Sequence, residues 1–171
     1  MGGEGVMEKI WVTYMEANSP PAQAKPFPNT VSLSKERLGY HDYMNLYRRV
    51  GGPLGWDTRL MMNAETLTDL LQSDISMTYI LRENDEAIGI CEFERQANDT
   101  VELKHFGLVP EAQGRGLGLA LLTHALKTIW QGKTKRVWLH TDECDSPAAK
   151  PTYEKAGFIT FDRRLEDQEF L

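Results

Sequence analysis

Hydrophobic and polar positions in the first third of the chain follow a strand period first and a helix period afterwards. Residues 10–15, IWVTYM, are rich in β-branched and aromatic side chains and predict a strand. Residues 18–29 contain four of the eight prolines and predict a loop, after which residues 30–33 predict a short second strand. Large apolar residues then recur at steps of three and four. Two amphipathic helices are therefore expected, at 40–50 and 64–71.

The rest of the chain returns to the strand period and then alternates between the two periods. Three successive antiparallel strands are expected, followed by a glycine-rich segment and a helix with one apolar face. The expected elements are strands at 77–82, 87–95 and 100–109, a helix at 118–130, a strand at 136–141, a helix at 147–156 and a strand at 158–164. No repeat or long linker divides them, which indicates one α/β (α+β) domain over residues 1–171.

Composition narrows the class of protein without indicating an activity. Of the 171 residues, 41% are hydrophobic and 26% are charged, which is typical of a soluble globular domain. No apolar run is long enough to span a membrane, and residues 1–8 lack a signal-peptide pattern and are expected to be a flexible extension. The net charge of −6 argues against a nucleic-acid partner. Cys91 and Cys144 are expected to be reduced thiols of a cytoplasmic protein, and no cysteine or histidine has metal-ligand spacing.

The segment QGRGLG at 113–118 stands between an expected strand and an expected helix. Unpaired backbone N–H groups and the positive end of the helix dipole make such a segment suited to a phosphate or pyrophosphate. A glycine-rich turn that only begins a helix is the plain alternative. No Lys-Ser or Lys-Thr pair follows, as a P-loop would need, and the third glycine of a dinucleotide fingerprint would fall on Leu119 or Leu121.

Two motifs together make the sequence resemble a known family. Val109 and Pro110 precede the pattern Q-x-x-G-x-G at 113–118, and the segment YEKAGF stands at 153–158. Both are similar to signatures of the GNAT superfamily of acyl-CoA N-acyltransferases, and the resemblance covers about residues 77–165. It implies a mixed, mostly antiparallel central sheet, flanked by helices and splayed at the strand that binds coenzyme A.

The resemblance also implies a binding site for acetyl-CoA. The pantetheine arm would lie along backbone near Leu108 and Val109, and Arg115 would add a charged contact to phosphate. Ser146 stands where the family often has asparagine and is expected to cap the following helix. The pyrophosphate would be held by the backbone of Gln113, Gly114, Arg115, Gly116, Leu117 and Gly118.

The family's chemistry needs a base for the amine and an acid for the departing thiolate. Glu102 matches the position of the base in protein-acetylating members, and His105 is the rival because an imidazole titrates near neutral pH. Strict alternation places Glu102 and His105 on opposite faces of their strand. Tyr153 matches the family's tyrosine, whose hydroxyl can protonate the sulfur of coenzyme A. For each residue, a purely structural role is the alternative.

The acceptor would bind near residues 40–59 if the family pattern holds. Tyr47, Trp56 and Asp57 are candidate contacts, because aromatic and acidic side chains together bind an ammonium group. The leading hypothesis is transfer of an acetyl group from acetyl-CoA to a primary amine of a small molecule or peptide. A non-catalytic acyl-CoA sensor and an enzyme for longer acyl chains are alternatives. Relatives often form homodimers, but no interface is evident in the sequence.

Overall fold

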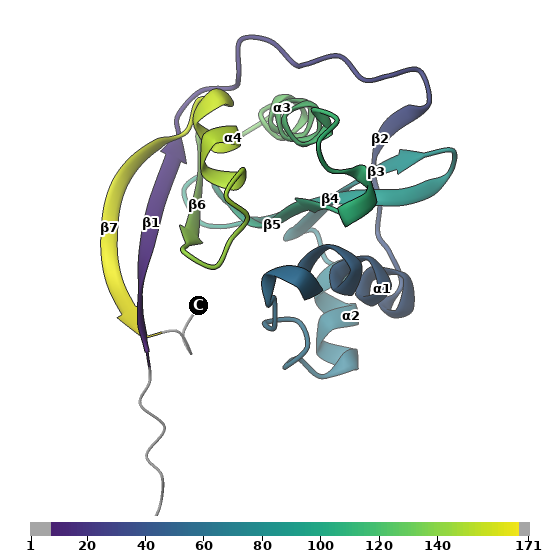
Figure 1. Ribbon diagram of the computed structural model, residues 1–171, viewed down its shortest axis with the longest axis horizontal. Helices are drawn as coiled ribbons and strands as arrows, with labels where there is room; N and C mark the ends of the chain where they lie inside the picture. The colour runs from purple at the N-terminus through teal and green to yellow at the C-terminus, as the bar shows by residue number, and fades with distance from the viewer. Residues whose placement is uncertain (1–7, 168–171) are drawn as a thin grey trace, which may run out of the picture.

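A mixed sheet forms the centre of the computed structural model, which describes residues 8–167. Its seven strands follow the order β2-β3-β4-β5-β6-β1-β7 (Figure 1). The expectation for residues 1–8 lies outside the described residues, apart from Glu8. The strands are β1 (Lys9–Ala17), β2 (Val31–Lys35), β3 (Ser76–Glu83), β4 (Glu86–Arg95), β5 (Thr100–Leu108), β6 (Arg136–Asp142) and β7 (Ile159–Asp167).

Helices cover both faces of this sheet, with α1 and α2 on one face and α3 and α4 on the other (Figure 1). The helical segments are α1 (Tyr40–Gly51), η1 (Gly52–Leu54), α2 (Ala64–Gln72), η2 (Pro110–Ala112), α3 (Leu117–Ile129) and α4 (Ala149–Lys155). The fold class predicted from the sequence is confirmed. Within residues 8–167, no helix has the length and apolarity needed to cross a membrane.

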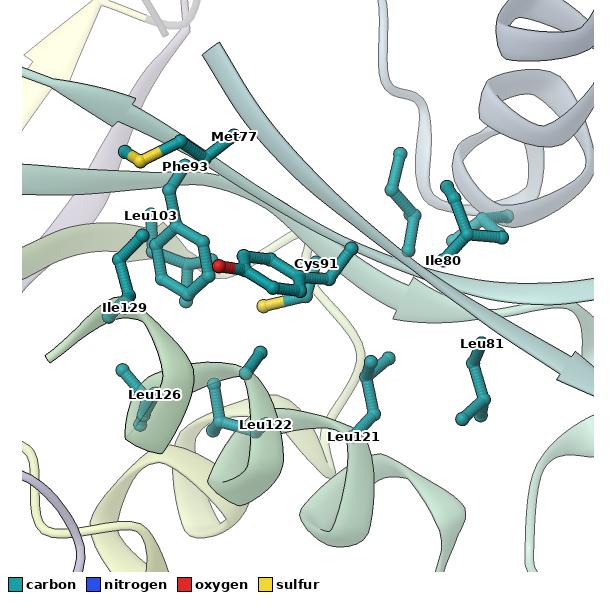
Figure 2. Packing of buried hydrophobic residues seen from close by; sticks show 14 of the residues in the cluster. Met77, Ile80, Leu81, Cys91, Phe93, Leu103, Leu121, Leu122, Leu126 and Ile129 are labelled. Atoms are coloured by element: carbon teal, nitrogen blue, oxygen red, sulfur yellow. The ribbon is translucent and has the colours of Figure 1, made fainter. Parts of the chain in front are cut away.

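The main core lies between the sheet and α3 (Figure 2). Phe93 and Cys91 point from β4 toward Leu122 and Leu126 of α3, and all four side chains are fully buried. Shortening a buried residue of this size, such as Phe93, to alanine typically costs about 3–5 kcal/mol of stability. The apolar face expected for α3 therefore anchors the glycine segment that precedes it.

The first strand lies far from its neighbours in sequence. β1 runs antiparallel between β6 and β7, and the chain then passes over α3 to reach β2 at the opposite edge of the sheet (Figure 1). This connection, the expected proline-rich loop, is fixed to α3. The Lys25 N–H donates to Thr123 Oγ1 at 3.1 Å, and Phe27 stacks on His124 with ring centroids 4.1 Å apart.

Strands β5 and β6 are parallel neighbours over only a short stretch. They pair from Thr100 with Arg136 to Glu102 with Trp138 and then separate. The splay implied by the family resemblance therefore begins after Glu102, and an opening forms between the two strands beyond that point.

A bulge in β5 corrects the predicted alternation of its side chains. Glu92 of β4 pairs with His105, whereas the next residue, Phe93, pairs with Leu103, so that Lys104 is an extra residue. Such an insertion shifts every later side chain to the other face of the strand. Glu102 and His105 consequently share the face toward α1, and the prediction that they lie on opposite faces was wrong.

Candidate active site

A cavity of about 650 Å³ opens where β5 and β6 separate. This volume lies in the range typical of sites for small molecules. Its walls are residues 103–108 of β5, the glycine segment, the beginning of α4 and a loop at 54–58 after α1. The cavity therefore joins the predicted anion-binding segment to the predicted acceptor region.

The glycine segment forms one end of the cavity. Gly114 and Gly116 have φ of +76° and +73°, a left-handed conformation that glycine adopts without strain. Gly116 is the N-cap of α3 and offers no side chain to the first-turn amides. Those amides and the helix dipole are therefore available to an anion. The residues of this segment that line the cavity are Gln113, Gly114, Gly116, Leu117 and Gly118.

Two cations near this segment differ in where they point. Arg115 does not line the cavity but forms two hydrogen bonds to Glu83 of β3, with the Nη2–Oε2 distance 2.5 Å. Lys25 does line the cavity, and a methyl group built on Gly116 would collide with its Nζ. The cation beside the glycine segment is therefore Lys25 rather than Arg115. Lys25 lies in the proline-rich loop, where no motif indicated it.

Tyr153 of α4 reaches the cavity from the opposite side of the opening. The side chain is 8% exposed and packs against Phe106 and Phe158, with ring centroids 5.6 and 5.9 Å away. Burial, with added repulsion from Asp145 and Cys91, raises the pKa of the Tyr153 phenol far above its usual value. The hydroxyl therefore keeps its proton at neutral pH, as a proton donor must.

His105 lines the cavity from β5 and rests on a buried carboxylate. Its Nδ1 lies 2.9 Å from Glu92 Oε1, and its ring packs against Tyr47 and Trp56. An ionised carboxylate only accepts hydrogen bonds, so we assign the proton to Nδ1 and the free lone pair to Nε2. A neutral His105 can then accept a proton at Nε2.

Glu92 is the site residue that sequence reasoning missed. Its carboxylate is fully buried and accepts hydrogen bonds from Tyr43 Oη and Arg59 Nη2, both at 2.6 Å. Burial alone would raise the pKa of Glu92, but its interactions with His105, Arg59 and Tyr43 lower it to about 2. A glutamate within the apolar run IGICEF was the available signal.

Comparison with known proteins identifies the family. Residues 41–158 match the model of the Acetyltransferase (GNAT) family. The chain belongs to this family.

Two curated relatives of this GNAT chain are mycothiol acetyltransferases. The protein from Corynebacterium efficiens is 29% identical over 111 residues, which are 65% of this chain and 36% of that protein. The protein from Paenarthrobacter aurescens is 41% identical over 56 residues, which are 33% of this chain and 17% of that protein. The chain thus spans about a third or less of the length of these relatives.

Solved GNAT structures share the fold at low sequence identity. A GCN5-related N-acetyltransferase from Sphaerobacter thermophilus has a TM-score of 0.70 and 19% identity, and the match covers 92% of this chain and 50% of that one. An aminoglycoside acetyltransferase from an uncultured soil metagenomic sample, in complex with sisomicin, has a TM-score of 0.62 and 14% identity. That match covers 74% of this chain and 88% of the other.

Not every predicted cofactor contact of this GNAT chain reaches the cavity. Leu108 lines it, but Val109 does not, and the Val109 N–H is already bonded to Ile88 O at 2.9 Å. Ser146 lines the cavity without capping α4, which begins at Ala149 with Ala148 as its N-cap. The expected cap is corrected, because the Ser146 Oγ accepts from the Ala148 N–H in the turn before the helix.

Glu102, the first choice for the base, lies outside the cavity lining. Its carboxylate accepts a hydrogen bond from Gln96 Nε2 at 3.0 Å and lies 3.4 Å from Lys104 Nζ. Both partners hold the carboxylate in its present position. His105, on the same face of β5, is the residue that reaches the cavity.

Of the three residues predicted to contact the acceptor, two line the cavity and one does not. Trp56 and Asp57 line the cavity, whereas Tyr47 is buried and its hydroxyl accepts a hydrogen bond from the Arg59 N–H. Tyr47 therefore supports the loop from below instead of facing the cavity. Among the described residues, no group of three or more His, Cys, Asp or Glu side chains is arranged to hold a metal.

Proposed function

We propose that this GNAT domain transfers the acetyl group of acetyl-CoA to a primary amine of a small molecule. The observation that carries the proposal is one continuous cavity, which has the uncapped start of α3 at one end and His105 and Tyr153 in its walls. The names of the curated mycothiol acetyltransferases support a small-molecule acceptor.

The pyrophosphate of acetyl-CoA would bind the amides of the glycine segment. These amides would donate hydrogen bonds to the phosphate oxygens, and the Lys25 ammonium beside Gly116 would add a positive charge. Leu108 and Ser146 would line the path of the pantetheine arm. Arg115 takes no part, because its guanidinium is engaged by Glu83.

The reaction needs a base for the acceptor and an acid for the departing thiolate. An alkyl ammonium first gives one proton to His105 Nε2, and its nitrogen lone pair then attacks the thioester carbon. The C–S bond breaks as the C–N bond becomes an amide, and Tyr153 protonates the departing thiolate. Tyr153 regains its proton from the new amide nitrogen through solvent, and His105 releases its proton to solvent.

Asp57 and Trp56 would receive the acceptor. A carboxylate and an indole face together attract an ammonium group through ion-pair and cation–π contacts. Asp142 and Asp145 also line the cavity, and burial together with repulsion from Asp145 raises the pKa of Asp142. A cationic acceptor would relieve this repulsion, whereas a carboxylate-rich acceptor would increase it.

Thiol release from acetyl-CoA tests the proposal. The purified chain is incubated with acetyl-CoA and, separately, an alkyl diamine, an amino sugar, a peptide α-amine and a lysine-containing peptide. We expect release with at least one small amine, with the product mass increased by one acetyl group. Tight binding of coenzyme A without release with any amine would contradict the proposal and favour a non-catalytic sensor.

A further inference from the structure

Two charged side chains are buried next to His105, namely Glu92 of β4 and Arg59 of the loop after α1. Glu92 Oε2 accepts from Arg59 Nη2 at 2.6 Å, and the same nitrogen donates to Glu94 Oε1 at 3.1 Å. Side-chain exposure is 6% for Arg59, 0% for Glu92 and 19% for Glu94. Burying charges is costly even when they are paired, so this cluster has no evident benefit for packing alone.

The cluster is not electrically balanced when His105 is neutral. Glu92 and Glu94 bring two negative charges and Arg59 brings one positive charge. Tyr43 brings no charge. Burial is the main reason that the pKa of its phenol lies far above neutral pH, and the negative charge of Glu92 raises it further. A proton on His105 brings the total to zero. The cluster therefore matches an imidazolium better than an imidazole.

We propose that the buried Glu92 and Arg59, with the partly exposed Glu94, form a counter-charge that holds His105 in place and stabilises the imidazolium formed when it deprotonates the acceptor. This inference rests on the proposed acetyl transfer. The proton moves from the ammonium nitrogen to His105 Nε2, while the Nδ1 proton stays on the ring and donates to Glu92. His105 is thus the catalytic base, and Glu92 and Arg59 are positioning residues.

Arg59, itself part of this counter-charge, belongs to a segment on the acceptor side of the cavity. It lies in the loop that also carries Trp56 and Asp57, both in the cavity lining. The Arg59 N–H donates to Tyr47 Oη at 3.2 Å, and its Nε donates to Tyr43 Oη at 3.3 Å. The loop that would meet the amine therefore also completes the charge cluster beneath the base.

The other ionisable groups around His105 do not change this charge balance. Tyr47 of α1 packs against the His105 ring, and Asp57 shares the cavity wall with it. On β5 itself, the charges of Glu102 and Lys104 offset each other across 3.4 Å. Asp57 faces the open cavity, where solvent screens it more than it screens the buried Glu92.

Substitutions that remove a negative or a positive charge from the cluster test the proposal. Glu92→Gln removes a negative charge at nearly constant volume, and Arg59→Met removes the positive one. The midpoint of the rise of kcat/KM with pH should move down by about one unit in Glu92→Gln and up by about one unit in Arg59→Met. The double variant and Arg59→Lys should both lie near the wild type, because each restores the net charge. In His105→Gln the rise should disappear, with kcat/KM reduced about 100-fold.

NMR titration of the CoA-bound protein gives the same comparison without turnover. His105 ring signals, assigned with His105→Gln, should shift their midpoints in the same two directions. Glu36→Gln is the matched control, because Glu36 also pairs with an arginine, Arg82 at 2.8 Å, but does so at the β2–β3 edge. The His105 midpoint should not move in this variant. If the wild type binds coenzyme A but releases no thiol, the proposed transfer fails while the NMR midpoints still decide the inference. The inference would be overturned if the His105 midpoints did not move, or if they moved in the same direction in both variants. It would also be overturned if the rise of kcat/KM with pH were lost in Glu102→Gln and kept in His105→Gln.

Discussion

The two ends of the cavity differ in whether backbone or side-chain groups form them. The cofactor end is mainly backbone: consecutive residues at 113–118 expose amides at the start of α3. The acceptor end is made of side chains, with Asp57 and His105 in its wall. Behind His105, the side chains of Tyr43, Arg59 and Glu92 form a buried network from three separate segments. A backbone site is sensitive to conformation and tolerant of side-chain exchange. A buried charge network is instead sensitive to the exchange of a side chain and more tolerant of small changes in backbone conformation.

The largest effect is expected on acid stability at the acceptor end. The folded pKa of Glu92 is lowered from 4.5 to about 2, so its contribution is complete above pH 4.5 and is lost as the pH falls toward 2. The shift corresponds to about 3 kcal/mol of unfolding free energy. Urea unfolding between pH 7 and pH 2.5 should therefore show a steeper loss of stability in the wild type than in Glu92→Gln. Equal pH dependence in the two proteins would contradict the assigned ionisation of Glu92.

The next effect concerns the proton donor between the two ends. Tyr153→Phe removes the hydroxyl but keeps the ring that packs on Phe106 and Phe158. We expect kcat to fall about 100-fold while the Kd for coenzyme A, measured by calorimetry, stays within twofold. Turnover equal to the wild type would remove Tyr153 from the mechanism.

A smaller effect is expected when the backbone at the cofactor end is changed. Gly116→Ala puts a methyl group on a residue with φ of +73° and against Lys25 Nζ. Left-handed backbone costs an alanine about 1 kcal/mol, so coenzyme A affinity should fall about fivefold with little change in the chemical step. Gly132→Ala is the control, because Gly132 has φ of +122°, open space around it and no place in the cavity lining. Equal losses of affinity in both variants would show that general destabilisation is the cause.

The smallest effect separates the two cations of the cofactor end. Lys25→Gln should weaken binding of coenzyme A about threefold at low salt and hardly at all at 0.5 M salt, because an exposed charge is screened. Arg115→Gln should leave the Kd unchanged, since Arg115 is paired with Glu83. The opposite ranking of the two variants would return the phosphate contact to Arg115.

Sequence patterns predicted the backbone end better than the side-chain end. The helix–turn signature at 113–118 is local, and the elements around it, such as α3 and β6, were predicted to within one or two residues. The bulge at Lys104 is set by pairing with β4, which no local period contains. Arg59 and Glu92 meet only because α1 and its following loop pack on β4, so their ion pair had no spacing that could indicate it.

The place of β1 in the sheet has a consequence for the order of folding. Trp11 pairs with Leu165, and Thr13 pairs with Thr141, so the first strand needs partners from the last part of the chain. Contacts between such distant residues close large loops and form slowly, whereas the β3–β4 and β4–β5 hairpins are local. We expect the hairpins to form early and β1 to insert between β6 and β7 last. A nascent chain on the ribosome would then keep β1 unpaired until almost all of its sequence had emerged.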